Sequence, residues 1–201
     1  MCITSVDVEN SSPRFHKNGY FDRNSPRQDE KLIDLALATS AAPTFFPLVD
    51  TRHSTNLTDG GIVANNPSLV GLVDAVQLTK HNLDNITLLS IGSGEQCHMP
   101  YDVEKLKNGG QKEWMIASKK SWNSWMFWKN KSSPIIELLM ESQSKLAHFQ
   151  TGFLLGDRYV RINPKLSITI GLDDKDKINS LKNLADIKEC DLKKIKGLLR
   201  E

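Results

Sequence analysis

With 39% hydrophobic and 25% charged residues, the 201-residue chain has enough apolar material for one full-sized soluble domain, or for a large piece of a bigger one. Its formal net charge of +2 gives no strong attraction to nucleic acid, so we expect no nucleic-acid partner. Three cysteines cannot all pair within the chain, and no two of them form a C-x-x-C metal motif, which favours a reducing compartment.

The N-terminal segment MCITSVDVENSSPR has no basic region followed by an apolar one, so no secretory signal is visible. No apolar run approaches the roughly 18 residues that a membrane-spanning helix requires. We therefore expect a soluble protein, cytoplasmic or peripheral at a membrane.

The first quarter of the chain predicts a strand, a loop, a helix and a second loop. Residues 2–8 (CITSVDV) indicate the strand, and the polar, Pro- and Gly-containing segment 11–28 indicates the loop. KLIDLALAT at 31–39 predicts the helix. Two prolines then end helical geometry, so SAAPTFFPLVD at 40–50 is expected to be an ordered, apolar loop.

The later elements predict an α/β layer architecture. Residues 67–79 have helical periodicity, with a proline near the first turn, and 86–92 (ITLLSIG) form an almost wholly apolar run. Such a run is typical of a strand buried on both faces, as in a parallel sheet. Residues 159–163 predict a later strand, and one or two amphipathic helices follow from Asp173. Sites in sheets of this kind gather at the carboxyl ends of strands.

The segment TDGGIVANNP at 58–67 holds the first candidate for chemistry. Asp-Gly between apolar flanks is a strong signal for a hairpin turn, which makes Asp59 a turn residue. A carboxylate held over Gly60 and Gly61 would also suit a general base, since no bulky group would block a reacting one. From the residues alone the turn interpretation is favoured.

Other candidate sites are weaker. No serine has glycine two residues before and two after it; Ser40, in ATSAA, has alanine at both places but follows a helix instead of a strand. The five histidines stand far apart and indicate surface or packing roles, so no metal site is expected. Gly92-Ser93-Gly94 could cradle a phosphate, but a tight turn is favoured.

All four tryptophans lie in one lysine-rich segment, EWMIASKKSWNSWMFWKN. On a helix Trp122, Trp125 and Trp128 would share one side with Trp114, as a segment lying in a membrane interface requires. A helix packed on the sheet is the favoured alternative to membrane contact.

Three segments together resemble the second half of patatin-like phospholipases: ATSAAPTFFP at 38–47, LTDGGIVANNP at 57–67 and LLSIGSGE at 88–95. The opening ITSVDVENSSPRFHKN, YVRINP and the late GLDDKDKINSLKNLADI are also similar to this family, so the resemblance covers nearly the whole chain. It implies an α/β fold, part of a patatin-like three-layer sandwich with a mostly parallel central sheet flanked by helices. In these terms residues 1–75 belong to the catalytic core, and 76–201 hold the remaining strands and the C-terminal helical region of the same domain.

The resemblance also implies an activity. Patatin-like enzymes are lipid acyl hydrolases with a Ser–Asp dyad and no catalytic histidine, and the D-G-G motif assigns the aspartate to Asp59. A desolvated carboxylate beside a serine can accept its proton in place of imidazole. Gly60 and Gly61 would let the backbone turn closely behind the dyad. A phospholipid or another acyl ester is the implied substrate, without a metal or organic cofactor.

The family's glycine-rich oxyanion loop and G-x-S-x-G both precede the part that this chain resembles, and the chain contains neither. We therefore expect the C-terminal part of such an enzyme, which contributes the base, lacks the nucleophile and is inactive alone. A complementary N-terminal half is a possible partner, and without it we expect an unstable or aggregation-prone chain. The alternative is a non-catalytic lipid-binding or regulatory remnant that uses the Trp/Lys segment 114–131.

Overall fold

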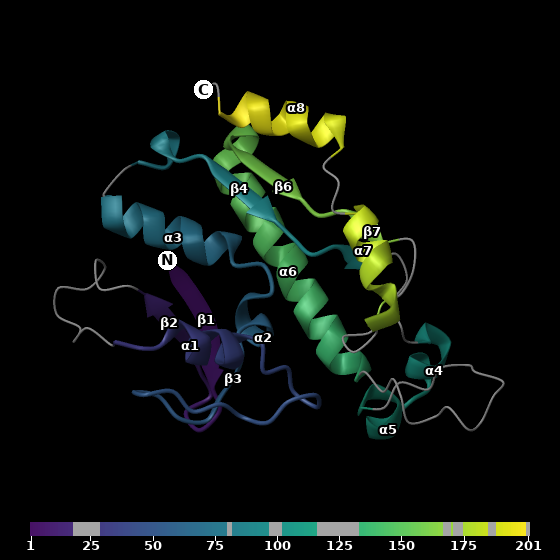
Figure 1. Cartoon of the computed structure of the whole chain (residues 1–201). Helices are drawn as coiled ribbons and strands as arrows, with labels where there is room; N and C mark the ends of the chain where they lie inside the picture. The colour runs from purple at the N-terminus through teal and green to yellow at the C-terminus, as the bar shows by residue number, and fades with distance from the viewer. Residues whose placement is uncertain are drawn as a thin grey trace. The chain divides into compact units, whose positions relative to one another are not determined.

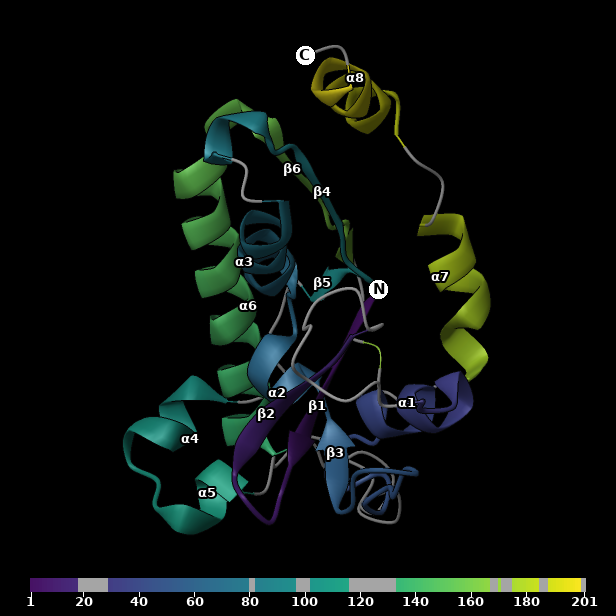
Figure 2. The ribbon, with the colours of Figure 1, turned by 90° about the vertical axis from the view of Figure 1, so that its left-hand side faces the viewer.

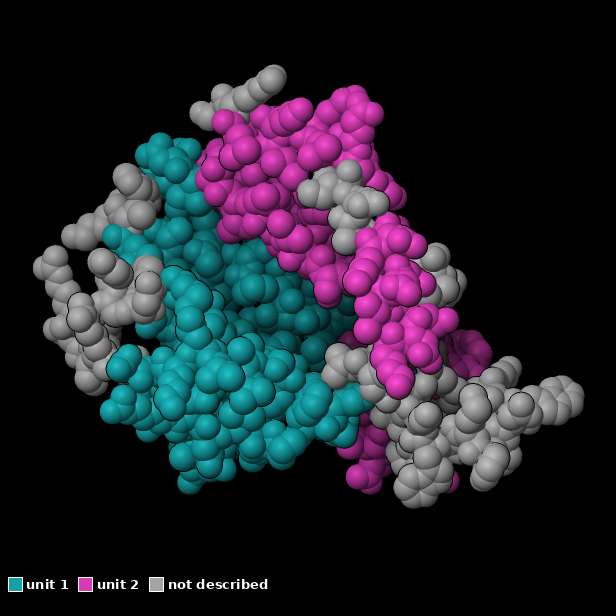
Figure 3. All heavy atoms as spheres, viewed as in Figure 1, with its two compact units in different colours: residues 1–86, 139–154 teal, residues 87–138, 155–201 magenta. Residues whose placement is uncertain are grey.

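The structure is a computed structural model (Figure 1), and the residues that it describes are 1–17, 29–79, 82–96, 102–115, 133–166, 170, 175–184 and 188–199. They fall into two compact units, coloured separately in Figure 3. Unit 1 comprises Met1–Ile86 and Leu139–Leu154, and unit 2 comprises Thr87–Leu138 and Leu155–Glu201. Each unit is described by itself.

Unit 1 contains a three-stranded antiparallel sheet in the order β2-β1-β3. Its strands are β1 (Cys2–Asp7), β2 (Ser12–Lys17) and β3 (Leu57–Asp59). The tight turn between β1 and β2 is held by Asp7, whose carboxylate accepts hydrogen bonds from the Asn10 backbone N–H at 3.0 Å and from Arg14 at 2.7 Å. Hydrogen bonds from Asn10 and Arg14 lower the pKa of Asp7 from 3.8 to about 2.

Helices accompany this sheet in unit 1: α1 (Leu32–Thr39), α2 (Gly61–Ala64), α3 (Ser68–Thr79), the single turn η1 (Leu83–Asn85) and residues 139–154 of α6 (Pro134–Leu155). In Figures 1 and 2, α1 lies on one side of the sheet, and α2 and α6 lie on the other. The side of α1 that packs against β1 and β3 carries Leu35 and Ala38, both buried. Together with Leu57 on β3 they form the apolar core around the strand that ends at Asp59.

Unit 2 contains two parallel pairs of strands, β4 with β6 and β5 with β7. Its strands are β4 (Leu88–Ile91), β5 (Glu95–Gln96), β6 (Tyr159–Ile162) and β7 (Lys165–Leu166). Its helices and single turns are α4 (Val103–Lys107), α5 (Gln111–Met115), η3 (Gly156–Arg158), η4 (Lys175–Lys177), α7 (Ile178–Leu184) and α8 (Glu189–Leu198). The described residues contain no helix long and apolar enough to cross a membrane.

The expected α/β fold is confirmed, although its sheets differ from the expectation in one respect. Parallel pairing occurs in both two-stranded sheets, whereas the three-stranded sheet is antiparallel. The predicted strands at 2–8, 86–92 and 159–163 and the predicted helices at 31–39 and 67–79 are all present, with slightly different ends. Two helices also follow Asp173, as predicted.

Two predictions about strands are wrong. Residues 12–17 form β2 instead of a loop; β2 lies at the edge of its sheet, where a proline such as Pro13 is tolerated. The remainder of the predicted loop, 18–28, lies outside the described residues. The strand β4 is not buried on both faces, because Leu89 and Ile91, which alternate onto one face, are exposed while Ser90 is buried.

Substitution of Gly60 tests how closely the backbone at the end of β3 approaches β1. A Cβ at this position would collide with the backbone oxygen of Thr4, which cannot move without distorting β1. We therefore expect Gly60→Ala to lower the free energy of unfolding by about 1–3 kcal/mol. Urea unfolding followed by circular dichroism measures the change.

Gly71→Ala is the matched control, because nothing lies within 4 Å of a Cβ at Gly71 in the middle of α3. Alanine in a helix interior is worth about 0.5–1 kcal/mol over glycine, so this variant should gain stability. Equal effects of the two substitutions would contradict the close approach at Gly60.

The burial of His16 predicts that the free energy of unfolding decreases at acidic pH. Its Nε2 lies 2.8 Å from the Oγ of Ser5, both side chains are buried, and burial lowers the pKa of His16 below 6.5. The unfolded chain then binds a proton more readily than the folded one, so stability is retained at neutral pH and falls as the pH drops below about 6.5. Between pH 7.5 and 5, His16→Gln should make this dependence shallower in urea unfolding, whereas the same change at the exposed His53 should not. An unchanged slope in His16→Gln would refute the assignment.

Candidate active site

Asp59 is the last residue of β3, and Gly61 is the first residue of α2, so the D-G-G motif forms a strand-to-helix turn. The hairpin that Asp-Gly suggested is therefore wrong. A two-residue type I′ hairpin turn requires positive φ at both central residues, but Gly60 has φ −64° and already has helical geometry. Asp59 lies at the carboxyl end of β3, an edge strand of the antiparallel sheet.

Hydrogen bonds hold Asp59 at both its backbone and its side chain. Its backbone N–H donates to the carbonyl oxygen of Ala41 at 3.1 Å. Its Oδ1 accepts the backbone N–H of Gly61 at 2.7 Å, which satisfies a donor in the first turn of α2. Among the described residues, Oδ2 has no hydrogen-bond partner. The carboxylate is thus fixed in direction and keeps one oxygen available.

The environment of Asp59 raises its pKa. Partial burial disfavours the charged form and raises the pKa above 3.8, while the hydrogen bond from Gly61 opposes this shift. No cation among the described residues contributes to the shift. Asp59 is therefore a stronger proton acceptor than an exposed aspartate, as a general base requires.

The glycines beside Asp59 have steric reasons to be glycine. A Cβ on Gly60 would collide with Thr4, and a Cβ on Gly61 would lie 2.9 Å from the Cε of Met140 and 3.1 Å from the Asp59 carboxylate. Both clashes arise from close approach, because neither glycine has positive φ. The second glycine leaves the space beside the carboxylate open.

The helix α6 forms hydrogen bonds with the segment that follows Asp59. The Gln143 side chain accepts the backbone N–H of Asn65 at 2.9 Å and donates to the carbonyl of Ile62 at 3.5 Å. The buried Asn66 side chain donates to the carbonyl of Ser144 at 3.2 Å. These contacts span about 80 residues of sequence, so local patterns could not identify Gln143 as a positioning residue.

Asn66 has a structural role that is typical of an asparagine placed just before a helix. Asn66 Oδ1 accepts the backbone N–H of Ser68, the first residue of α3, at 3.2 Å and thereby caps this helix, with Pro67 directly before it. The N-N-P sequence thus ends the turn after Asp59 and starts the next helix.

Ser5 is paired with Asp59 across β1 and β3, but no described serine has the environment of a nucleophile. The Ser40 hydroxyl donates to the carbonyl of Ala36 at 2.7 Å at the end of α1, which satisfies the helix terminus. Ser5 and His16 form a pair that resembles part of a hydrolase triad and that the sequence analysis does not predict. The Ser5 side chain is completely buried in β1, where no substrate reaches it, and His16 has the packing role expected for a histidine.

The remaining candidates have the following outcomes. In the 92–94 loop, the Gly92 N–H donates to the carbonyl of Ile162 at 2.8 Å and the Gly94 N–H donates to Asn163 Oδ1 at 2.9 Å. Because these amides are already paired, the tight turn is favoured over a phosphate cradle.

No group of three or more metal-ligating side chains occurs among the described residues. The proposed membrane contacts, Trp122, Trp125 and Trp128, lie outside them.

Comparison with known proteins finds relatives of one family. The family model "Patatin-like phospholipase" matches residues 3–71, which include β1, α1 and the whole D-G-G segment. The chain is 28% identical to Patatin-like protein 4 of Arabidopsis thaliana over 211 residues, 93% of this chain and 50% of the relative. No solved structure gives a significant match.

Bacterial relatives match a shorter part at higher identity. A cGAMP-activated phospholipase of Escherichia coli (strain TW11681) is 40% identical over 99 residues, 45% of this chain and 27% of the relative. A cGAMP-activated phospholipase of Vibrio cholerae is 38% identical over 101 residues, 47% of this chain and 28% of the relative. The chain spans about half the length or less of the curated relatives it matches. Over residues 3–71 by the family model, and over most of its length by comparison with the plant relatives, the chain is similar to patatin-like phospholipases.

Proposed function

We propose that this chain is the part of a lipid acyl hydrolase that supplies Asp59 as the general base of a Ser–Asp dyad. The observation that carries the proposal is the Asp59 carboxylate, which has a raised pKa, is fixed by Gly61 through one oxygen and has the other available. Similarity to the patatin-like phospholipase model and two relatives that are named phospholipases support a phospholipid or another acyl ester as the substrate.

The proposed reaction needs only protein groups. Asp59 accepts the proton of a serine hydroxyl as the serine oxygen attacks the ester carbonyl carbon, and it returns that proton to the departing alcohol. Water then attacks the acyl-enzyme and gives a proton to Asp59, which returns it to the serine oxygen as the serine–acyl bond breaks and the carboxylic acid leaves. No serine in the 201 residues has the G-x-S-x-G context, so we place the nucleophile on a polypeptide segment outside them.

Exposed apolar residues support the need for a complementary segment. Leu89 and Ile91 on β4, and Leu32 and Ile33 on α1, are large hydrophobic side chains exposed to solvent. Surfaces of this kind mark interaction sites or aggregation liabilities. We therefore expect the isolated chain to aggregate at concentrations where a mixture with its complementary half stays in solution, and analytical ultracentrifugation measures this difference.

A fluorophosphonate probe and an ester substrate test for the missing nucleophile. The isolated chain should neither be labelled nor turn over the ester, and addition of a polypeptide that carries the family's G-x-S-x-G part should produce both. Labelling of the 201-residue chain alone would show that it contains its own nucleophile. Failure of both readouts in a stable mixed complex would sink the proposed hydrolase.

Asp59→Asn separates a general base from a turn residue in the complemented enzyme. Asparagine can still accept the Gly61 N–H but cannot take a proton, so kcat/KM should fall by about 10²- to 10⁴-fold. The same variant should be more stable at pH 7, since it removes a charge that burial disfavours, and this gain should vanish below the pKa of Asp59. A residue that only shapes the turn would show the gain in stability without the loss of rate.

Asp50→Asn is the matched control for this substitution. Asp50 Oδ1 also accepts a backbone N–H, from Asn56 at 2.8 Å, and asparagine preserves that bond. Its kcat/KM should stay within about twofold of the wild type. An equal loss in both variants would mean that the assay reports folding instead of catalysis.

The alternative function is a non-catalytic, lipid-binding or regulatory role for the Trp/Lys segment 114–131. It predicts liposome binding by the isolated chain without turnover under any condition. Combined substitution of Trp122, Trp125 and Trp128 by alanine should then abolish co-sedimentation. Binding that survives the triple substitution refutes the alternative.

A further inference from the structure

The loop after α1 contains a turn with unusual backbone geometry. The carbonyl oxygen of Ala42 accepts the backbone N–H of Phe45 at 3.1 Å, which closes a four-residue turn with Pro43 and Thr44 at its centre. Thr44 has φ 72°, as the third position of a type II turn requires. Glycine or asparagine is usual there, and a β-branched residue with positive φ is an outlier that clusters at functional sites.

This turn exposes an aromatic pair to solvent. Phe45 is 44% exposed and Phe46 is 57% exposed, and Leu48 two residues later is also exposed. The segment from Ser40 to Val49, SAAPTFFPLV, carries no charged residue. A single exposed hydrophobic side chain is ordinary, but an uncharged cluster on a strained and hydrogen-bonded turn is a feature that packing alone does not require.

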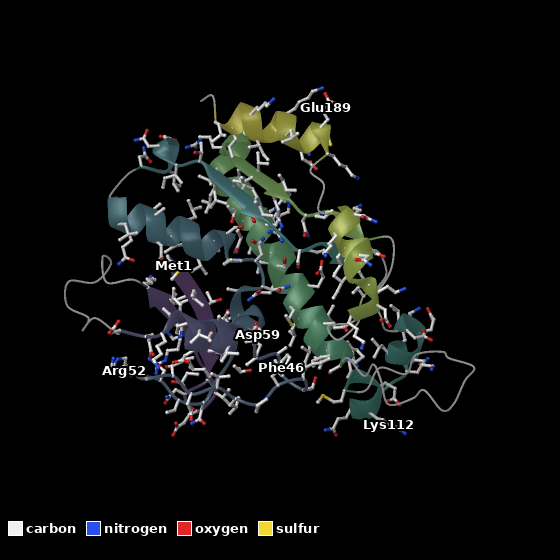
Figure 4. All side chains as sticks on the ribbon, in the orientation of Figure 1. Met1, Phe46, Arg52, Asp59, Lys112 and Glu189 are labelled. Atoms are coloured by element: carbon white, nitrogen blue, oxygen red, sulfur yellow. The ribbon has the colours of Figure 1, made fainter. Side chains whose placement is uncertain are left out.

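The same backbone holds the turn beside the candidate base. The carbonyl of Ala41 accepts the Asp59 N–H at 3.1 Å and the Thr58 hydroxyl at 2.8 Å, and the next carbonyl, Ala42, accepts the N–H groups of Phe45 and Phe46. Phe46 and Asp59 are both labelled in Figure 4. Two consecutive carbonyls therefore hold the backbone of Asp59 and the backbone of the aromatic pair.

We propose that Phe45, Phe46 and Leu48 form the contact surface for the acyl chain of the lipid substrate. This inference rests on the proposed function, because an ester carbonyl that reacts next to Asp59 has its hydrocarbon chain attached to the reacting carbon. The uncharged, aromatic composition of the cluster matches a hydrocarbon chain and does not match a charged headgroup. Each methylene removed from water contributes roughly a three- to fourfold gain in affinity.

Equilibrium dialysis of the 201-residue chain with labelled dodecanoate, below its critical micelle concentration, tests the surface without a catalytic readout. The Phe45→Ser/Phe46→Ser variant should bind dodecanoate about tenfold or more weakly, whereas Phe45→Leu/Phe46→Leu should stay within about threefold of the wild type, because leucine keeps the surface apolar. Butanoate should bind weakly to all of them. Thermal unfolding by circular dichroism confirms that each variant folds.

The chain offers a matched control on α6. Phe149 and Phe153 are 68% and 82% exposed, and their rings stack with centroids 6.4 Å apart. Phe153 lies 13 residues from Met140, about 20 Å along the helix from the Gly61 turn. Phe149→Ser/Phe153→Ser removes an exposed aromatic pair of the same kind and should leave dodecanoate binding unchanged.

Two outcomes overturn the inference. Equal losses in the two serine variants, or no loss in Phe45→Ser/Phe46→Ser, would remove the acyl-chain role. Binding to phosphatidylcholine vesicles without binding to monomeric dodecanoate would make the cluster a bilayer contact instead. Dodecanoate binding is measured without a nucleophile and without turnover, so the acyl-chain surface and the proposed hydrolysis can fail independently.

Discussion

The carbonyl oxygen of Ala41 is the contact on which the rest of the site depends. It accepts both the Thr58 hydroxyl and the Asp59 N–H, and it thereby fixes the loop after α1 to the edge of β3. A buried backbone oxygen with two donors is satisfied and loses free energy if either donor moves away. This connection positions the backbone of Asp59 and, through the next residue, the carbonyl of Ala42 that closes the aromatic turn.

The helix α6 constrains the position of the segment after Asp59. Gln143 and Ser144 contact the segment after Asp59, and Met140 lies close to Gly61. Asp59 is thus held between a loop that precedes it by about 18 residues and a helix that follows it by about 80. Contact with α6 explains why Gly61 must be small, whereas Gly60 is constrained by Thr4 on β1.

Local patterns predicted the elements whose periodicity is clear, such as β1, α1 and α3. They failed at β2, because an edge strand with a polar, proline-containing sequence looks like a loop. They also gave no prediction for α6, whose apolar residues lie on both its packed and its exposed sides, as Met140 and Phe149 illustrate. Asp59 was a candidate from resemblance, but its contacts with Ala41 and its neighbours on α6 are tertiary and could not be predicted from spacing.

The hydrogen bond between Gly61 and Asp59 makes the two oxygens of the carboxylate chemically different. Oδ1 accepts a hydrogen bond from a backbone donor that the start of α2 holds in place, and a proton on this oxygen would weaken that bond. Oδ2 has no such donor among the described residues. Protonation of Oδ2 therefore costs less free energy than protonation of Oδ1, and the backbone alone sets this difference.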